Sequence, residues 1–262
     1  MMIVVVPIVA LVVDVNNYIT ASSASAQAYE TATLLKTLEV SALITGEVGV
    51  GKKTLAEYIL HKAPVLEALN LDELLNTLES SSDIIILNLQ KLPNTKKVFD
   101  ALKLKKIRVI ATAKSFYNNE YIDDFFSVKF DIPPLRERME DVEMLIQKFV
   151  KEASLLFSVG NDFKIENLKP DLSKNADSLR RQIMIYSLLQ DIKDDELIDV
   201  FENYLMDKLG SNNDYKKFLY LYEVPLIRAG LSKFKSQLQL AERLGLNRNT
   251  LRKKIAENKK YL

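Results

Sequence analysis

The pattern of apolar positions predicts a buried α/β arrangement in the first part of the chain. Thr31–Leu38 has the spacing of a helix, and the apolar run Ser41–Thr45 is typical of a short buried strand. Residues 1–18 contain the run MMIVVVPIVALVV, whose Val and Ile content favours a strand or hairpin at the edge of the main domain. This run has no basic residue before it, is interrupted by Pro7 and Asp14, and is too short to span a bilayer. We therefore interpret it as part of the fold of a cytoplasmic protein and not as a signal peptide.

The apolar pattern at the end of the chain predicts two helices joined by a tight turn. In the first helix, Ser236–Leu244, three residues share one face: Leu238, Ala241 and Leu244. Gly245 follows and can adopt the positive φ that such a turn needs. Asn247 is a favourable N-cap for the second helix, which runs to Ile255 with Leu251 facing inward beside it. This pattern is typical of a DNA-binding helix-turn-helix.

Composition and charge place the nucleic-acid signal at this end of the chain. The 262 residues, 48% hydrophobic and 27% charged, can bury one sizeable core and a smaller satellite. Lys and Arg total 36 against 35 Asp and Glu, yet the segment from Ser232 onward has nine basic residues and two acidic ones. This local excess favours phosphate binding, with a solvated basic helix as the alternative. The absence of cysteine excludes disulfides and thiolate chemistry, and the single histidine, His61, is interpreted as a surface residue near a helix end.

The second helix of the motif exposes a row of polar and basic side chains, which suits a helix in the major groove of double-stranded DNA. Its first turn, expected near base edges or adjacent phosphates, holds Asn247, Arg248, Asn249 and Thr250. Arg252, one turn further, is the best candidate for a bidentate contact with guanine. Lys253 and Lys254 are expected to contact the DNA backbone.

Apolar residues also recur at helical spacing ahead of this motif, after a polar linker at Gly210–Asp214. They are Phe218, Leu219, Leu221, Tyr222, Leu226, Ile227 and Leu231. A segment of this size cannot bury them alone. We expect them to form a dimer interface, although some can pack on the helix-turn-helix of the same chain.

A glycine-rich sequence after the predicted strand has the spacing of a P-loop. Its backbone N–H groups could surround a phosphate, Lys52 would reach the β- and γ-phosphates, and the helix Thr54–His61 would point its N-terminus at them. The expected nucleotide-binding residues are Gly46, Glu47, Gly49, Val50, Gly51, Lys52, Lys53 and Thr54. The expected ligand is ATP or ADP. Lys53 takes the place of the usual Ser or Thr that binds Mg²⁺, and Thr54 follows one position after it. Mg²⁺ binding is therefore doubtful, and no metal site is assigned.

These motifs resemble a known family. LAERLGLNRNTLRKKIAE is similar to the C-terminal domain of the factor for inversion stimulation, the module that also ends the sigma-54-dependent activators. GEVGVGKKT resembles the P-loop GESGTGKE in the AAA+ domain of those activators. Three further strings match in order: DIIILNLQ, RVIATAK, and IPPLRER followed by Glu140-Asp141-Val142. The resemblance extends from about Ile19 to the end of the chain.

The resemblance implies an α/β fold with a parallel sheet core of the P-loop AAA+ type, a small helical lid, and a C-terminal all-α helix-turn-helix domain. The implied divisions are 1–18 as an apolar strand segment, 19–139 as a degenerate AAA+ nucleotide-binding domain, 140–209 as a helical lid, and 215–262 as the DNA-binding domain. In that family the helices at about Tyr215–Phe234 pair two subunits into a dimer.

The resemblance also implies that several catalytic residues are missing. Asn88 and Leu89 replace the acidic pair that would hold Mg²⁺ and orient water. The remaining replacements are Lys114 for the sensor asparagine, Asn118 and Asp124 for the arginine fingers, and Asp177 for a phosphate-sensing arginine. An acid such as Asp124 repels the negative charge that grows in phosphoryl transfer and cannot stabilise it. About twenty residues separate the P-loop helix from Asp83, which leaves no room for the GAFTGA loop that contacts sigma-54.

The sequence thus predicts a dimeric, sequence-specific DNA-binding transcriptional regulator whose AAA+ domain binds nucleotide but has no catalytic residues. The alternatives are a weakly active ATPase and a regulatory subunit that associates with an intact sigma-54-dependent activator. Double-stranded DNA and a second copy of the chain are the expected partners, with a paralogous activator or RNA polymerase as further candidates and no membrane.

Overall fold

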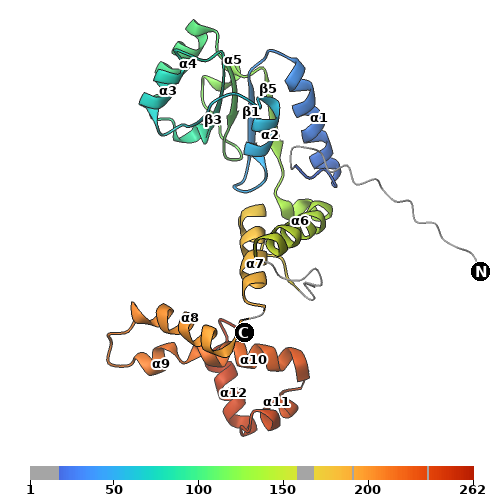
Figure 1. Cartoon of the computed structure of the whole chain (residues 1–262), viewed down its shortest axis with the longest axis vertical. Coiled ribbons are helices and arrows are strands. Elements are labelled where there is room, and N and C mark those ends of the chain that lie inside the picture. Colours follow the sequence, from blue (N-terminus) through green and yellow to red (C-terminus); the bar gives the residue numbers. More distant parts are fainter. Residues whose placement is uncertain (1–17, 158–167, 191, 235) are drawn as a thin grey trace, which may run out of the picture. The chain divides into compact units, whose positions relative to one another are not determined.

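The computed structural model describes residues 18–157, 168–190, 192–234 and 236–262 (Figure 1). The chain divides into two compact units, residues 1–191 and 192–262. The strand or hairpin expected in residues 1–18 lies outside the described residues except for Tyr18. No helix of the described segments is long and apolar enough to cross a membrane.

The first unit contains a parallel five-stranded sheet in the order β2-β3-β4-β1-β5. The strands are β1 Ala42–Gly46, β2 Val65–Glu67, β3 Asp83–Leu87, β4 Arg108–Thr112 and β5 Val128–Ile132. Because the strands are parallel, their carboxyl ends share one edge of the sheet, where the loop after Gly46 emerges. This sheet confirms the predicted α/β fold with a parallel core.

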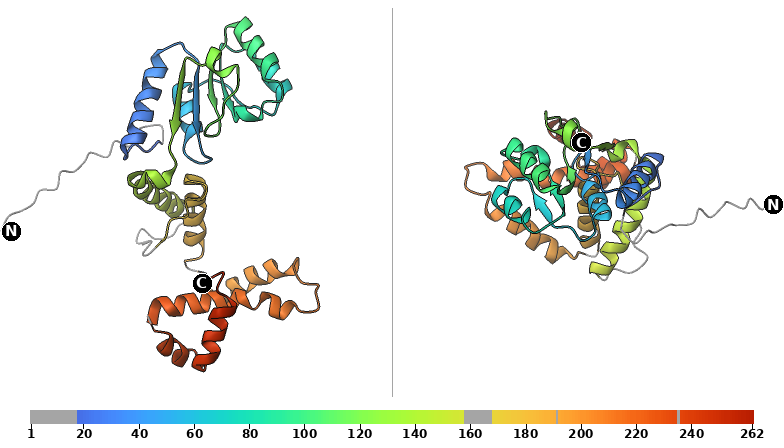
Figure 2. Two further views of the ribbon diagram at one scale, coloured as in Figure 1. Left: turned by 180° about the vertical axis from the view of Figure 1, so that it is seen from behind. Right: turned by 90° about the horizontal axis from the view of Figure 1, so that it is seen from above.

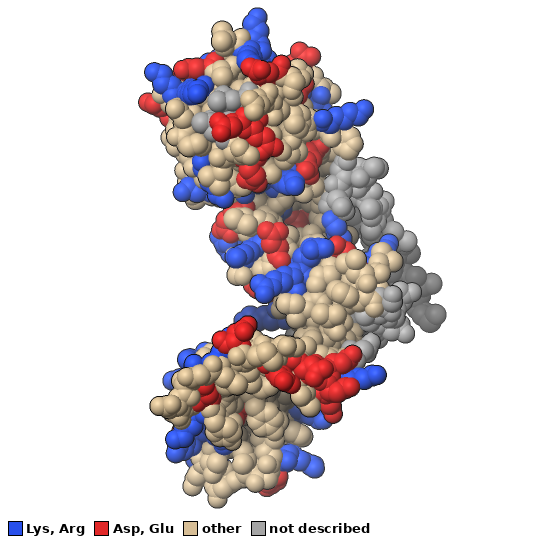
Figure 3. Space-filling view, turned by 60° about the vertical axis from the view of Figure 1, so that its left-hand side comes forward, with Lys and Arg blue, Asp and Glu red and all other residues tan. Residues whose placement is uncertain are grey.

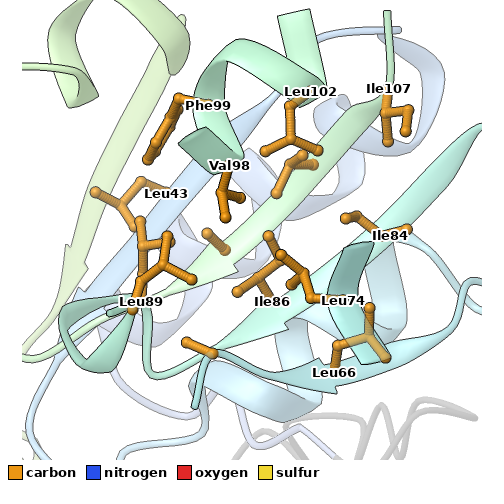
Figure 4. Close-up of a cluster of buried hydrophobic side chains, with 14 of the residues drawn as sticks. Leu43, Leu66, Leu74, Ile84, Ile86, Leu89, Val98, Phe99, Leu102 and Ile107 are labelled. Atoms are coloured by element: carbon orange, nitrogen blue, oxygen red, sulfur yellow. The ribbon is translucent and has the colours of Figure 1, made fainter. Parts of the chain in front are cut away.

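Helices cover both faces of the sheet (Figure 2). They are α1 Ser23–Thr37, α2 Lys52–Ile59, α3 Leu71–Thr77, α4 Thr95–Lys105 and α5 Ile122–Phe125. Successive strand residues point to opposite faces, so Ile84 and Ile86 pack with α3 and α4, whereas Ile85 packs with α1 and α2. Figure 4 shows Ile84, Ile86 and Phe99 in the first of these cores. Burial on both faces explains why the strands read as continuous apolar runs.

Several element bounds differ from those expected. α1 begins at Ser23, capped by Ser22, well before the expected Thr31, because its first turns bury small residues that carry little apolar signal. β3 ends at Leu87, because the next residue, Asn88, has a left-handed backbone with a φ of 57°. The short 3₁₀ helix Leu89–Lys91 follows it. α2 runs from Lys52 to Ile59, two residues earlier at each end than expected, and exposed His61 follows it.

Two helices complete the first unit, α6 Met139–Phe157 and α7 Ala176–Leu188, preceded by the 3₁₀ helix Leu135–Glu137. They share a small core of Leu135, Val142, Phe149, Ala153, Leu179 and Ile183. The lid expected at 140–209 is therefore divided, because the unit boundary precedes the next helix.

In the second unit, the described residues form helices and no strand, which confirms the all-α class of the C-terminal part. They are α8 Asp194–Met206, α9 Asp214–Phe218, α10 Tyr220–Phe234, α11 Gln237–Arg243 and α12 Arg248–Glu257. Gly245 has a φ of 63° in the turn between the last two helices. The central core contains Ile227, Leu240, Ala241 and Leu251.

The buried face of α11 differs from the expected one. Leu238 is 51% exposed, and Leu240 is fully buried in its place. Leu240 packs against Gly230 of α10, where an added Cβ would lie 2.2 Å from Leu240 Cδ1. The glycine therefore lets α10 and α11 approach closely.

Candidate nucleotide and DNA sites

The P-loop connects the carboxyl end of β1 with the start of α2. Gly49 and Gly51 have φ values of 78° and 104°, a left-handed conformation that side chains with a Cβ rarely adopt. Gly51 is the N-cap of α2, so the free N–H groups of this helix face the loop. The structure thus brings Gly46, Lys52 and Thr54 to one edge of the sheet.

Lys52 contacts the loop itself. Its Nζ donates hydrogen bonds to the carbonyl oxygens of Gly46 at 2.7 Å and Glu47 at 2.5 Å. Burial lowers the pKa of Lys52 from its usual value. Three nearby carboxylates oppose this shift: Asp131, Asp177 and Glu47. The ammonium group is therefore held in the centre of the loop.

The start of α7 lies directly against the P-loop. The backbone N–H of Ala176 donates to the oxygen of Gly49 at 3.1 Å, and Asn175 Nδ2 donates to the oxygen of Val48 at 2.9 Å. A Cβ on Gly49 would lie 2.2 Å from the carbonyl oxygen of Lys174. Only glycine fits this contact, which brings Asp177 next to the loop.

Glu47 connects the P-loop to two other segments. Arg136 donates two hydrogen bonds to its carboxylate, at 2.7 and 2.9 Å, and Asn175 donates a third at 3.1 Å. The hydrogen bond from Arg136, followed by that from Asn175, lowers the pKa of Glu47. This carboxylate is therefore fixed by protein donors.

A buried ion pair that the sequence analysis did not identify supports the same loop. Arg138 and Asp141, 3% and 1% exposed, lie 3.1 Å apart. Asp141 accepts hydrogen bonds from the backbone and hydroxyl of Ser22, and Arg138 donates to Ser25 Oγ at 2.6 Å and to the oxygen of Val50 at 3.2 Å. This network connects the starts of α1 and α6 with the P-loop. Arg138 and Asp141 are three residues apart, but Ser22 and Ser25 lie more than a hundred residues before them, so local spacing does not indicate the network.

A cavity of about 190 Å³ lies beside the P-loop. Its lining includes Tyr18, Ile19, Thr54, Leu145 and Phe149 together with the loop backbone at 49–51. The Tyr18 ring packs so closely on Gly51 that an added Cβ would lie 2.8 Å from it. Sequence analysis missed this cavity because Tyr18 and Phe149 come from distant segments.

The positions expected to lack catalytic groups differ in their surroundings. Asn88, at the end of β3, donates a hydrogen bond from Nδ2 to Glu67 Oε2 at 3.0 Å. Leu89 is 1% exposed and packs in the sheet core. The side chains of Lys114, Asn118 and Asp124 are exposed.

The helix-turn-helix presents most of the expected DNA-binding side chains. Asn247 caps α12 by accepting a hydrogen bond from the N–H of Asn249 at 2.8 Å. Four further residues are exposed on this helix: Arg248, Thr250, Arg252 and Lys253. Lys254 differs, because its ammonium group pairs with Glu223 of α10 and its side chain is only 28% exposed. On the face shown in Figure 3, basic and acidic side chains are interspersed, in line with the near-neutral total charge.

Known proteins share parts of this chain. Residues 221–257 match the family described as bacterial regulatory protein, Fis family. The DNA-binding transcriptional regulator NtrC of Azospirillum brasilense is 31% identical over 167 residues, which is 50% of this chain and 35% of NtrC. NtrC of Rhizobium meliloti is likewise 31% identical over 170 residues, with the same coverage. These alignments thus span about a third of the length of the curated relatives.

Solved structures show the same fold. NtrX from Brucella abortus in complex with ATP has a TM-score of 0.54 at 16% identity and covers 92% of this chain and 69% of NtrX. The complex of NtrX with ADP has a TM-score of 0.55 at 16% identity, over 91% and 69% of the two chains. The Fis-family segment, the NtrC likeness and the fold shared with NtrX together make this chain similar to the sigma-54-dependent activators, with an AAA+-like fold in the first unit and a C-terminal helix-turn-helix.

Proposed function

We propose that this protein is a sequence-specific DNA-binding transcriptional regulator whose AAA+ unit binds nucleotide without appreciable turnover. The observation that supports it most directly is the exposed, N-capped helix α12 within the Fis-family segment 221–257. The curated relatives are DNA-binding transcriptional regulators. A regulator of this type acts where the chromosome is, so we place it in the bacterial cytoplasm.

In this proposal α12 lies in the major groove. Arg248, Asn249 and Thr250 contact base edges or adjacent phosphates, and Arg252 contacts guanine. Lys253 and Lys259 are exposed and further along the chain, which suits phosphate contacts. Sequence preference and salt-dependent affinity therefore reside in different side chains.

The DNA test begins by selecting bound duplexes from a random pool with the full chain. Arg252→Ala is expected to weaken binding to the selected duplex by roughly 1–3 kcal/mol and to relax sequence preference. Lys259→Ala, the matched control, is expected to weaken binding to all duplexes alike. It should also lower the salt slope, the dependence of log affinity on log salt concentration, by about one. If both variants bind selected and random duplexes as tightly as the wild type, α12 is not the reading helix.

For nucleotide, the proposal rests on the P-loop, the adjoining cavity and the fold shared with NtrX, which was crystallised with ATP and with ADP. Gly46–Lys52 would hold the phosphates, and the cavity beside Tyr18 is positioned for the base. Magnesium has little to bind, because Asn88 is engaged with Glu67 and the Lys53 side chain pairs with Glu57 at 3.6 Å. The segment 65–77 forms β2 and α3, which supports the proposal that the sigma-54 contact loop is missing.

Calorimetry with ATP and ADP, each with and without Mg²⁺, tests this site. We expect weak binding that changes little with Mg²⁺ and is lost in Lys52→Ala, whereas Lys62→Ala, at an exposed lysine outside the P-loop, binds like the wild type. Phosphate release should be negligible in all three proteins. Strictly Mg²⁺-dependent binding, or turnover at typical enzyme rates of about 1–10³ s⁻¹, would contradict the proposal.

A slow ATPase is the second candidate, and Glu67 favours it. Its carboxylate lies 3.0 Å from the Asn88 amide, close to the position of the missing acid pair. A carboxylate there could orient water. Phosphate release that is measurable in the wild type and abolished by Glu67→Gln, but not by Glu73→Gln on the neighbouring helix α3, would support this candidate over a purely binding role.

We also propose that a second copy of the chain covers α8. Among the described residues α8 buries none of its own side chains, although it carries Leu197, Ile198, Val200, Phe201 and Tyr204. An isolated helix of 13 residues is marginal in water, so this apolar face needs a partner. The apolar positions that the sequence predicts for a dimer interface include Tyr222, which is 65% exposed. A helix-turn-helix that reads two half-sites supplies the reason for a symmetric copy.

Sedimentation of the full chain tests the dimer. The wild type should sediment as a dimer, and Phe201→Asp should yield a monomer with weaker DNA binding. Leu104→Asp, at an 84% exposed leucine of the other unit, serves as the matched control and should remain dimeric. A monomeric wild type at high concentration with intact specific DNA binding would disprove this part of the proposal.

A further inference from the structure

Lys254 belongs to the basic row of α12, yet its ammonium group contacts protein. It pairs with Glu223 of α10, whose side chain is 12% exposed, and is itself 28% exposed. The adjacent Lys253 points outward with 78% exposure and lies 3.9 Å from Glu257. Two neighbouring lysines of one helix therefore have different surroundings.

Further contacts join the end of α12 to α10. Asn258 is 8% exposed, and its Nδ2 donates to the oxygen of Lys254 at 3.0 Å and to Glu223 Oε2 at 3.4 Å. Arg228 of α10 donates to the carbonyl oxygen of Tyr261. Tyr220 stacks on Tyr261 with ring centroids 4.8 Å apart and planes 5° apart. Together these residues form a polar tether between the two helices.

This tether fixes an angle that the apolar core defines less strictly. Leu251 is the buried apolar residue of α12 and packs among Ile227 and Leu240, with Ile255 partly buried against the same core. The Glu223–Lys254 pair adds a second attachment about one turn from Leu251, which restrains the angle between α10 and α12. In the proposed dimer α10 adjoins the partner, so its angle to α12 sets the separation of the two reading helices.

We propose that Glu223 and Lys254 are positioning residues that set the half-site spacing on DNA, and that Lys254 makes no phosphate contact. This inference rests on the proposed DNA-binding function. Dimeric helix-turn-helix proteins read half-sites about 10–10.5 base pairs apart or at multiples of this distance, so a change of helix angle alters the accepted spacing.

The first test compares Lys254→Met with the matched variant Lys253→Met in the full chain. Binding to the selected duplex is measured over a range of salt, and then over a series in which the half-site spacing changes by one base pair at a time. Lys254→Met should weaken binding to the preferred duplex about tenfold, similar to losing one base contact. It should also reduce the preference for one half-site spacing and leave the salt slope unchanged. Lys253→Met should keep the spacing preference and lower the slope by about 0.9.

The second test exchanges the charges. Glu223→Lys combined with Lys254→Glu keeps the pair but puts a carboxylate on α12. A positioning role predicts that the double variant recovers spacing preference and most of the affinity lost by Lys254→Glu alone. A phosphate contact predicts no recovery, because the carboxylate repels DNA. Circular dichroism confirms that each variant is folded before it is scored.

A salt slope that falls by about 0.9 in Lys254→Met with unchanged spacing preference would overturn the inference. No recovery in the folded double variant would overturn it as well. These results leave wild-type binding intact and so differ from failure of the proposed function, in which the wild-type chain itself shows no specific binding.

Discussion

The two units differ in how completely each one buries its own apolar residues. In the first, both faces of the sheet are covered, and Ile84, Ile85 and Ile86 are fully buried in succession. In the second, the central core is small and α8 contributes no buried residue among those described. The first unit therefore covers its sheet with its own helices, whereas the second leaves an apolar face of α8 exposed, which is the basis of the proposed dimer.

The largest expected effect is in the first unit. Asp141→Ala leaves the Arg138 guanidinium buried without its partner, which should lower the free energy of unfolding by about 3–5 kcal/mol. Urea denaturation followed by hydrogen exchange of the sheet amides measures it. Asp100→Ala, at an exposed carboxylate of α4, should change stability by less than about 0.5 kcal/mol. A loss below about 1 kcal/mol for Asp141→Ala would show that the network is not essential to this unit.

A smaller effect is expected in the second unit from Gly230→Ala. The new methyl group would overlap Leu240, which should cost about 1–3 kcal/mol and exceed the gain of about 1 kcal/mol in helix propensity. Hydrogen exchange of the α11 and α12 amides measures the net loss. Ala229→Gly, at the exposed neighbour, should cost about 1 kcal/mol by propensity alone. If Gly230→Ala instead stabilises the unit, the close packing of α10 on α11 is not required.

Arg136→Ala should change the pKa of Glu47 more than it changes the free energy of unfolding. Removing the guanidinium raises the pKa of Glu47 toward its usual value, since the hydrogen bond from Arg136 is the main cause of the lowered pKa. In the wild type the stabilisation from the Arg136–Glu47 contact is fully present at pH values above the usual Glu pKa. It is lost as the pH falls through the lowered pKa of Glu47. A carboxyl NMR titration tests it, with Glu152, paired with Arg180, as the unchanged reference. An unmoved Glu47 pKa would contradict the assignment.

The smallest effect concerns Asp214 at the start of α9. Hydrogen bonds from Ser211 and from the Gly210 N–H lower its pKa to about 2. Because the folded pKa is depressed, the stabilisation is present above the usual Asp value and is lost only as pH falls through about 2. In an NMR titration its carboxyl signal should stay constant down to about pH 3. Titration near the usual value of 3.8 would show that this turn is open.

The sequence was sufficient for features whose residues are adjacent in the chain. Strand β1, the P-loop and the turn at Gly245 have local signals, and the parallel α/β fold followed from the family resemblance. Features that depend on distant partners were missed. The Arg138–Asp141 network joins residues far apart in sequence, and the pairing of Lys254 depends on Glu223 31 residues before it.

The buried face of α11 shows a second limit. Leu238, Leu240, Ala241 and Leu244 all lie within two helical turns, so more than one face has apolar spacing. Gly230 on the facing helix decides in favour of Leu240, and spacing within α11 cannot show this. The linker expected at Gly210–Asp214 likewise falls inside the second unit, because composition does not show that α8 belongs there.

The ends of the sheet restrict how the first unit can associate. Its outermost strands are β2, only three residues long with Val65 and Glu67 exposed, and β5, which carries exposed Lys129 and Asp131. Short and charged edges resist pairing with a strand from another molecule. The sheet therefore cannot readily be extended from chain to chain, which protects this unit from β-type aggregation and leaves helices and loops as its surfaces for assembly.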